Sequence, residues 1–458
     1  MKQNLLLAAV LLLFVAPGTA LSEPSFDKGR AEFGRLLRAG TPEERARGVY
    51  ALDGFDRPEA VRLLTRAVLT RKDRAVVIRS AQRLLSAMKS DESSRVIAEE
   101  AMKGPWLKRA RLVEAMGRSE HPAVVDALLA ACYDEDPRVR TSAVLALDLA
   151  KSERADFALA DALRAPQWTV RAAAIDSIRR RGRSEAGGPL VDCLPAERGR
   201  LRGDVAAALR LITNQPIGVF PEAWENWRIA GQGGEPLPLG AAREIPPTAE
   251  LAGVSTWAKR VVFVLALSDS MNRKLQAAPD SLAPPDVKER GGPELRRWRE
   301  ATTKVELARL WVAWGIAHLS PDVRFDVVTY GQGVDAAFGE LVPATPQNRE
   351  KATDRIRSLS ASGEANLHAG LMKVFDLVSR DPLDTKSLEE GPEAVFFVSD
   401  GYCDYGEIPD GFAALDEAEQ LNRFRQIVFH CFGVGEHDSR ILGTLAGFAG
   451  GGELVALP

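Results

Sequence analysis

An arginine returns about every 31 residues through the first half of the chain. The six positions are Arg45, Arg79, Arg109, Arg140, Arg171 and Arg202. Each of these arginines precedes small apolar residues at helical spacing, and each period also contains an earlier helix pattern. A fixed period of this size predicts an α-solenoid of helical hairpins over residues 21–230. One hairpin cannot bury its own apolar face, so its stability comes from stacking on its neighbours.

The clearest unit of the repeat begins at Asp136, which can cap a helix whose first turn holds Pro137. Apolar residues at i, i+4, i+7, i+8 and i+11 from Val139 then share one helix face. This pattern resembles HEAT repeats of the short bacterial kind, an armadillo-like fold. The resemblance implies that the arginines form a ladder with acids of neighbouring units, a role that suits Asp73 and Asp134. The other repeats lack so clear an acid, so we expect a partial, structural ladder.

Two tryptophans follow the last repeat. Trp224 and Trp227 share a helix face at i, i+3 spacing, and we expect them to cap the open end of the array. A binding patch is the alternative interpretation.

The composition changes after this point. Residues 231–256 are interpreted as a linker, because 231–247 are rich in glycine and proline without apolar periodicity. A linker of this kind makes relative domain motion the default expectation. Residues 257–458 then alternate strand and helix patterns, which predicts a doubly wound α/β sheet. The predicted strands are 261–267, 324–330, 336–341, 394–399, 427–434 and 454–457. The predicted helices are 304–319, 348–359, 366–378, 416–425 and 441–448.

The first of these strands is a continuous apolar run that ends in Ser268-Asp269-Ser270-Met271. Ligands of open α/β sheets bind at the carboxyl ends of such strands. Further motifs follow in order at Lys304–Ala308, Val398–Gly401, Phe432–Gly435 and Ala446–Gly451. Together they resemble a von Willebrand factor A (VWA) domain.

That family has a metal-ion-dependent adhesion site, built from two serines and an aspartate, a threonine from a second loop and an aspartate from a third. The resemblance matches Ser268, Ser270 and Asp400 to the two serines and the third-loop aspartate. Ala266 replaces the first aspartate and Ala365 replaces the threonine. Magnesium and calcium prefer several oxygen ligands with compensating charge, so we expect a degenerate site without a resident cofactor.

Two nearby acids keep a second interpretation open. Asp269 and Glu364 could return a carboxylate to the site, which would then bind Mg²⁺ or Ca²⁺ weakly. The candidate ligand-binding residues are Ser268, Asp269, Ser270, Glu364, Asn366 and Asp400. Of these, Ser268, Ser270 and Asp400 are the possible metal ligands. Residues 271–300 form a proline-rich insertion at the same sheet edge, which is either a lid for the site or an irregular excursion.

The N-terminus predicts export. Lys2 precedes an apolar core at Leu5–Val15, and small residues end at Ala20, so residues 1–20 are interpreted as a signal peptide. An uncleaved anchor is the alternative, and no other stretch predicts a membrane span. We expect a periplasmic or secreted protein. The even number of cysteines permits disulfides, but buried thiols explain them equally well. These are Cys132, Cys193, Cys403 and Cys431.

The functional prediction is a non-enzymatic scaffold that binds protein partners. No nucleophile, metalloprotease or phosphate-loop motif is present, and five histidines are scattered. A net charge of −3 gives no general attraction for nucleic acid, and the arginines at 179–183 are expected to be a solvated helix end. The alternatives are metal-dependent, adhesion-type ligand binding through a non-standard site, and a structural subunit of an envelope assembly.

Overall fold

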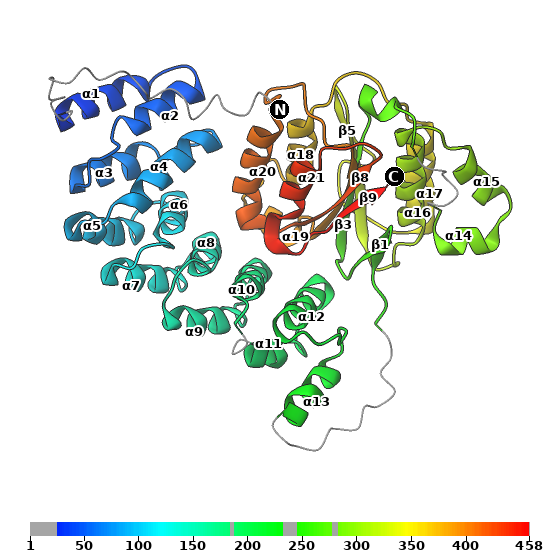
Figure 1. Ribbon diagram of the computed structural model, residues 1–458, viewed down its shortest axis with the longest axis horizontal. Coiled ribbons are helices and arrows are strands. Elements are labelled where there is room, and N and C mark those ends of the chain that lie inside the picture. The colour runs from blue at the N-terminus through cyan, green and yellow to red at the C-terminus, as the bar shows by residue number, and fades with distance from the viewer. Residues whose placement is uncertain (1–24, 184–186, 232–244, 277–282, 458) are drawn as a thin grey trace.

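The computed structural model describes residues 25–183, 187–231, 245–276 and 283–457. The predicted signal peptide at 1–20 lies outside the described residues. The structure confirms the predicted fold class, with a helical solenoid followed by an α/β domain (Figure 1). Within the described ranges, no helix combines the length and the apolar character that crossing a bilayer requires.

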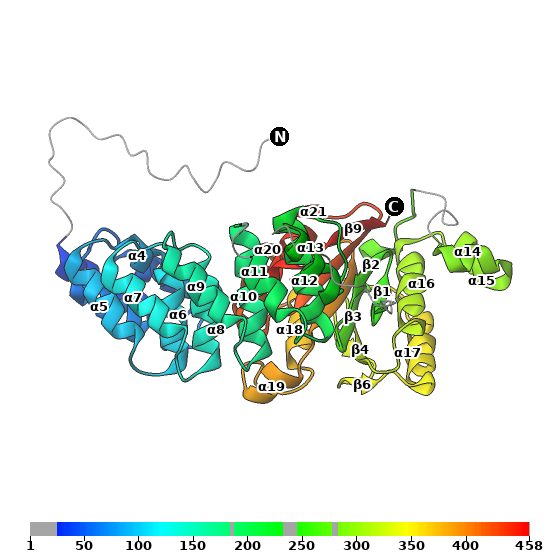
Figure 2. The ribbon, with the colours of Figure 1, turned by 90° about the horizontal axis from the view of Figure 1, so that it is seen from below.

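The solenoid packs its helices in two layers (Figures 1 and 2). Its helices are α1 (Phe26–Leu36), α2 (Pro42–Tyr50), α3 (Pro58–Ala67), α4 (Ala75–Ala87), α5 (Asp91–Ala101), α6 (Trp106–Met116), α7 (Pro122–Ala131), α8 (Pro137–Leu147), α9 (Glu153–Ala162), α10 (Trp168–Arg181), α11 (Gly187–Cys193), α12 (Gly199–Thr213) and α13 (Pro221–Gly231). We call α2, α4, α6, α8, α10 and α12 the inner layer, since each stacks on the next. The outer layer is α3, α5, α7, α9 and α11.

Helix α8 shows why these segments form stacked helices. The Asp136 carboxylate accepts a hydrogen bond from the backbone N–H of Arg138 at 2.9 Å, and Pro137 occupies the first turn. Val139, Ala143 and Leu147 are buried on the face that packs between α6 and α10. At the end of the array, Trp224 is fully buried and its indole N–H donates to the Gly218 carbonyl at 2.8 Å, as expected of a cap.

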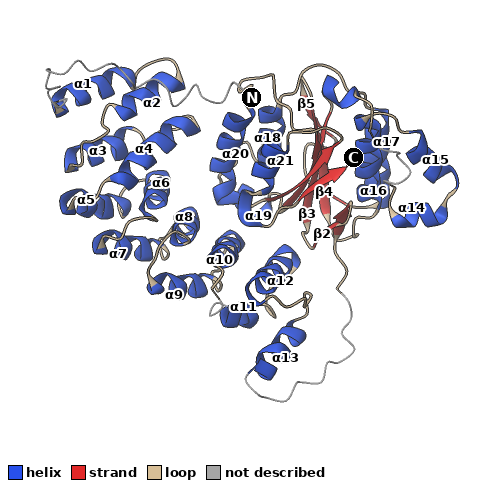
Figure 3. Ribbon diagram, in the orientation of Figure 1, coloured by secondary structure: helices blue, strands red, loops and turns tan. Residues whose placement is uncertain are grey.

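The α/β domain is a mainly parallel sheet with helices on both faces (Figure 3). Its strand order is β5-β4-β3-β7-β8-β9, with β5 and β6 antiparallel to β4. The strands are β3 (Arg260–Ala266), β4 (Arg324–Tyr330), β5 (Val334–Ala336), β6 (Val342–Pro343), β7 (Ala394–Ser399), β8 (Val428–Val434) and β9 (Leu454–Leu457). On one face lie α16 (Lys304–Ala317) and α17 (Pro346–Ser358). On the other lie α18 (Leu367–Asp376), α20 (Gly411–Arg425) and α21 (Ser439–Ala446).

Two predictions about this domain's edges were wrong. Residues 336–341 are mostly a loop rather than a strand, because the buried Asp326 carboxylate accepts backbone hydrogen bonds from Phe338 at 3.1 Å and Gly339 at 2.9 Å. The predicted linker 231–256 contains a hairpin of β1 (Ala249–Leu251) and β2 (Val254–Thr256). Its Leu251 is buried in the core of the α/β domain against α16, so these residues belong to that domain.

The proline-rich insertion contains short helices. It contains the short 3-10 helix η2 (Asp269–Asn272), α14 (Pro285–Arg290) and α15 (Gly292–Glu300). Trp298 is buried and packs edge-on against Trp311 of α16, with the ring centroids 5.1 Å apart. The helical part of the insertion therefore packs on α16, at the outer side of the domain (Figure 1).

Candidate recognition site at the carboxyl ends of the strands

The two main polar loops meet because their strands are neighbours. Strands β3 and β7 pair in parallel, with Leu265 opposite Val398, so both end at one edge of the sheet. Ser268 and Asp400 follow these strands and are both buried. The structure thus places them at one edge, as the sequence predicted.

Hydrogen bonds from backbone N–H groups join the second loop, residues 362–367, to the loops that follow β3 and β7. The Ser362 N–H donates to Leu267 O at 2.8 Å, and the Asp269 N–H donates to Gly363 O at 2.7 Å. The Ala365 N–H donates to the carboxylate of Asp404 at 2.7 Å. Asp404 was not predicted from the sequence, since no motif marks a side chain whose role is to hold a neighbouring loop.

The candidate residues range from buried through partly buried to fully exposed. The hydroxyls of Ser268 and Ser270 are 2.9 Å apart and hydrogen-bond to each other. Asn366 caps α18, because its side-chain oxygen accepts from the Ala369 N–H at 3.0 Å. Asp269 and Glu364 are exposed on the loop surface.

The buried carboxylate of Asp400 already has a cationic partner. The Lys304 ammonium lies 3.3 Å from Asp400 Oδ2, and the two side chains are only 2% and 1% exposed. The same ammonium donates a hydrogen bond to the carbonyl oxygen of Glu436. In the sequence, Lys304 marks only the start of a predicted helix and of one motif. A signal was present, because a cation in the first turn opposes the helix dipole and calls for another partner.

These residues do not fit a divalent cation. Ala266 and Ala365 are buried and offer no side-chain oxygen. Among the residues that the structure describes, no group of three or more His, Cys, Asp or Glu side chains is arranged to hold a metal ion. The buried carboxylate of this site, Asp400, is already paired with the Lys304 ammonium. A hard cation therefore lacks the charged oxygen ligands that it prefers.

The inner layer of the array faces the α/β domain and contacts it, so the linker is not the only connection between the two domains (Figure 1). Arg79 pairs with Asp416 of α20 at 2.8 Å and also with Glu419. The N–H of Ala75, at the start of α4, donates to the Glu417 carboxylate at 2.8 Å. That bond caps a helix that has no side-chain cap of its own.

Apolar contacts extend the same interface. Phe424 of α20 packs edge-on against Trp106, with the ring centroids 5.7 Å apart. Helix α19 (Thr385–Glu390), which sequence analysis missed, places the Leu388 carbonyl where it accepts from the Trp168 indole at 2.9 Å. Phe424 and Leu388 are buried in one cluster with the core of the array. The two domains are therefore packed together rather than merely tethered.

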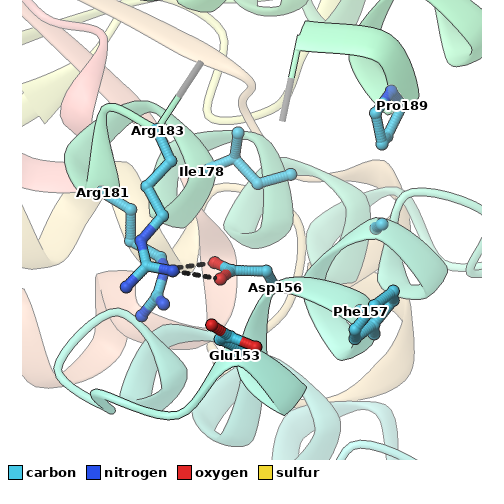
Figure 4. Close-up of a pocket in the computed structure, with 8 residues that line it drawn as sticks. Glu153, Asp156, Phe157, Ile178, Arg181, Arg183 and Pro189 are labelled. Carbon is cyan, nitrogen blue, oxygen red and sulfur yellow. Dashed lines mark hydrogen bonds and ion pairs between the residues drawn. The ribbon is translucent and has the colours of Figure 1, made fainter. Parts of the chain in front are cut away.

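Two further features lie outside the strand-end site. A cavity of about 540 Å³ lies between α9, α10 and Pro189, where Asp156 accepts from Arg181 at 2.8 Å and Arg183 at 2.6 Å (Figure 4). These ion pairs show that the basic cluster is engaged by acids of the array.

All four cysteines are free, and burial raises the pKa of Cys132 to about 12.

Comparisons with known proteins agree with this architecture. A family model described as HEAT repeats matches residues 95–179. Inter-alpha-trypsin inhibitor heavy chain H1 of Mesocricetus auratus is 25% identical over 154 residues, which are 34% of this chain and 14% of that protein. The Bos taurus protein of the same name is 25% identical over 143 residues, or 31% of this chain and 13% of that one. The chain thus covers a small part of these relatives.

Two solved structures are also similar. A von Willebrand factor type A protein from Catenulispora acidiphila shares 19% identity and covers 48% of each chain, with a TM-score of 0.31. Proximal thread matrix protein 1 from the mussel byssus shares 14% identity and covers 46% of this chain and 44% of that one, with a TM-score of 0.30. The HEAT-repeat match and the helical hairpins, together with the doubly wound sheet and its ordered motifs, support a HEAT-repeat array followed by a VWA-type domain.

Proposed function

We propose that this chain is an exported, non-enzymatic scaffold that binds another protein through the loop surface of its VWA-type domain, without a metal ion. One observation carries the proposal. The domain is held against the array by α19 and α20, while Asp269, Glu364 and Tyr405 remain exposed at the strand-end loops. Repeat arrays and VWA-type domains are protein-interaction modules, which supports protein binding as the common purpose.

The exposed loop surface is acidic and carries an aromatic side chain. Hydrogen bonds from Asp269 N–H to Gly363 O and from Ala365 N–H to Asp404 hold three carboxylates, Asp269, Glu364 and Asp404, on adjoining loops. Tyr405 is half-exposed beside them. Aromatic residues are enriched at protein interfaces, and complementary charge steers association, so the expected partner surface is basic.

Capture from the native host tests this proposal. Full-length protein carrying Asp269→Lys and Glu364→Lys should lose the partner that the wild type retains, because both changes reverse charge on the loop surface. Glu350→Lys with Asp354→Lys, on exposed positions of α17, gives the same change in net charge away from the loops and should keep the partner. Equal capture by both variants would exclude the loop surface and favour a structural subunit.

Export belongs to the same proposal and has its own measurement. Mass spectrometry of the mature protein from fractionated cells should find an N-terminus after Ala20 in the envelope or the medium. A cytoplasmic chain that keeps Met1 would contradict it.

A further inference from the structure

The surroundings of Lys304 form a built site for one ammonium group. Its Nζ contacts the Asp400 carboxylate at 3.3 Å and donates to the Glu436 carbonyl. The ring of Tyr402 lies 5.8 Å from Nζ, within reach of a cation–π contact. Gly435 has a φ of +58°, and a Cβ there would lie 3.0 Å from Lys304 Cε, so glycine leaves the room that the lysine side chain fills.

Because the Lys304 and Asp400 side chains are both buried, their opposite charges must compensate each other. A carboxylate withdrawn from water is strongly destabilising unless a positive charge compensates it. In the adhesion sites that this domain resembles, a divalent cation provides that charge at the strand ends. Here the Asp400 side chain is 1% exposed, and the compensating charge is covalently part of the chain.

We propose that the Lys304 ammonium replaces the divalent cation, so that the strand-end loops are ordered by an internal ion pair and Mg²⁺, Mn²⁺ or Ca²⁺ is excluded. Two positive charges cannot share one buried carboxylate without strong repulsion. The ammonium bonds to Asp400 and to a carbonyl oxygen, so it does not need further side-chain ligands. This explains why alanines at 266 and 365 can stand where the family has an aspartate and a threonine. This inference deepens the metal-free function proposed above, but its test uses no protein partner.

The first arm of the test is a double-mutant cycle on the full chain. Lys304→Gln and Asp400→Asn should each lower the melting temperature, because each leaves one buried charge unpaired. The double variant Lys304→Gln/Asp400→Asn should recover most of that loss. Additive losses would mean that the two groups do not compensate each other, and would overturn the proposal.

The second arm restores the missing ligands. Ala266→Asp with Ala365→Thr supplies the two side chains that the family uses at these positions. Adding Lys304→Gln to this pair should raise the Mn²⁺ affinity measured by calorimetry by at least about tenfold. Tight binding by the pair with Lys304 still present, or an equal affinity with and without it, would overturn the inference.

The wild type provides a readout that does not depend on any variant folding. Its melting temperature should be the same in chelator and in millimolar Mg²⁺, Mn²⁺ or Ca²⁺, since the cation position is already filled. A rise that Asp400→Asn abolishes would show a working metal site and would overturn the inference. Loss of protein capture by the loop-surface variant is independent of this result, so the two proposals fail separately.

Discussion

The repeated arginines show how one residue type serves two purposes. Arg45 and Arg109 pair with Asp73 and Asp134 of the following units, at 2.6 Å and 2.7 Å, which confirms the predicted ladder for these two. Arg171 pairs with Glu197 at 2.7 Å, an acid that sequence analysis did not recognise. Arg79 departs from the pattern and contacts the other domain instead. A repeat therefore predicts which residues are structural, but not which one an interface takes over.

The sequence predicted where the candidate site residues lie, but not which side chains they contact. The alternating pattern predicts parallel strands whose carboxyl ends share one sheet edge, and this places Ser268 and Asp400 at that edge. That Asp400 faces an ammonium depends on how α16 enters the domain after a long insertion. No spacing rule in the sequence records this contact, which connects residues far apart in the chain.

His430 gives a pH-dependent prediction. It is buried in β8 beside Phe396, and its Nδ1 has no hydrogen-bond partner among the described residues. Burial, and then the charge of Arg200, lowers the pKa of His430 from 6.5 to about 4. Between these pH values the unfolded chain binds more protons, so stability is fully present above pH 6.5 and falls as the pH drops toward 4. The histidine accounts for roughly 3 kcal/mol of that loss.

Urea unfolding of the wild type and of His430→Phe across this pH range checks the prediction. The variant should lose less free energy of unfolding as the pH falls, because phenylalanine takes up no proton and its ring suits the aromatic neighbour. Parallel slopes for the two proteins would contradict the assignment.

At the scale of elements, the regular parts of the chain were well predicted and the junctions were not. Strands 324–330 and 454–457 have the predicted bounds, since both segments are rich in the apolar residues that favour strands. The hairpin at 249–256 was missed because its short strands follow directly on a glycine- and proline-rich segment. Helix α19 was missed because it is short and lacks a full apolar period.

The insertion between β3 and α16 should behave as part of the core. Trp298→Ala is expected to cost about 3–5 kcal/mol of unfolding free energy, since a side chain that is 2% exposed leaves a cavity against Trp311. Arg297→Ala, on the exposed side of α15, should change stability by no more than about 0.5 kcal/mol. Chemical denaturation measures both. Equal, small effects would mean that the insertion does not stabilise the domain.

At the scale of the whole molecule, the array uses its inner layer to hold its own VWA-type domain. At one end of the interface, a Cβ on Gly450 would collide with Asp176 of α10, so only glycine lets the 3-10 helix η4 (Phe448–Gly450) come this close. At the other end, Arg74 of the array pairs with Glu407. Contacts thus extend from α4 to α10, and the surface that such arrays offer to partners is largely used within the chain. The partner binding that we propose is left to the loop surface and to the outer layer.

Charge reversal at Arg79 should loosen this interface without unfolding either domain. Arg79 is 38% exposed, so its pairs with Asp416 and Glu419 are each worth only about 0–1 kcal/mol. Arg79→Glu replaces both attractions by repulsions, whereas the Phe424–Trp106 contact remains. Docking should therefore weaken, and partial opening should expose the Ala75 N–H that bonds to Glu417.

Hydrogen exchange of the peptide covering residues 73–79 measures that opening. Exchange at Ala75 should accelerate by about tenfold in Arg79→Glu, because a change near 1.4 kcal/mol shifts an opening equilibrium by that factor. Adding Glu419→Arg should slow it again by restoring an opposite pair. Arg154→Glu breaks a more exposed pair with Asp126 on the outer layer and should leave Ala75 unchanged. Unaltered exchange in Arg79→Glu would show that apolar packing alone holds the domains, since the buried Phe424 and Leu388 would then suffice.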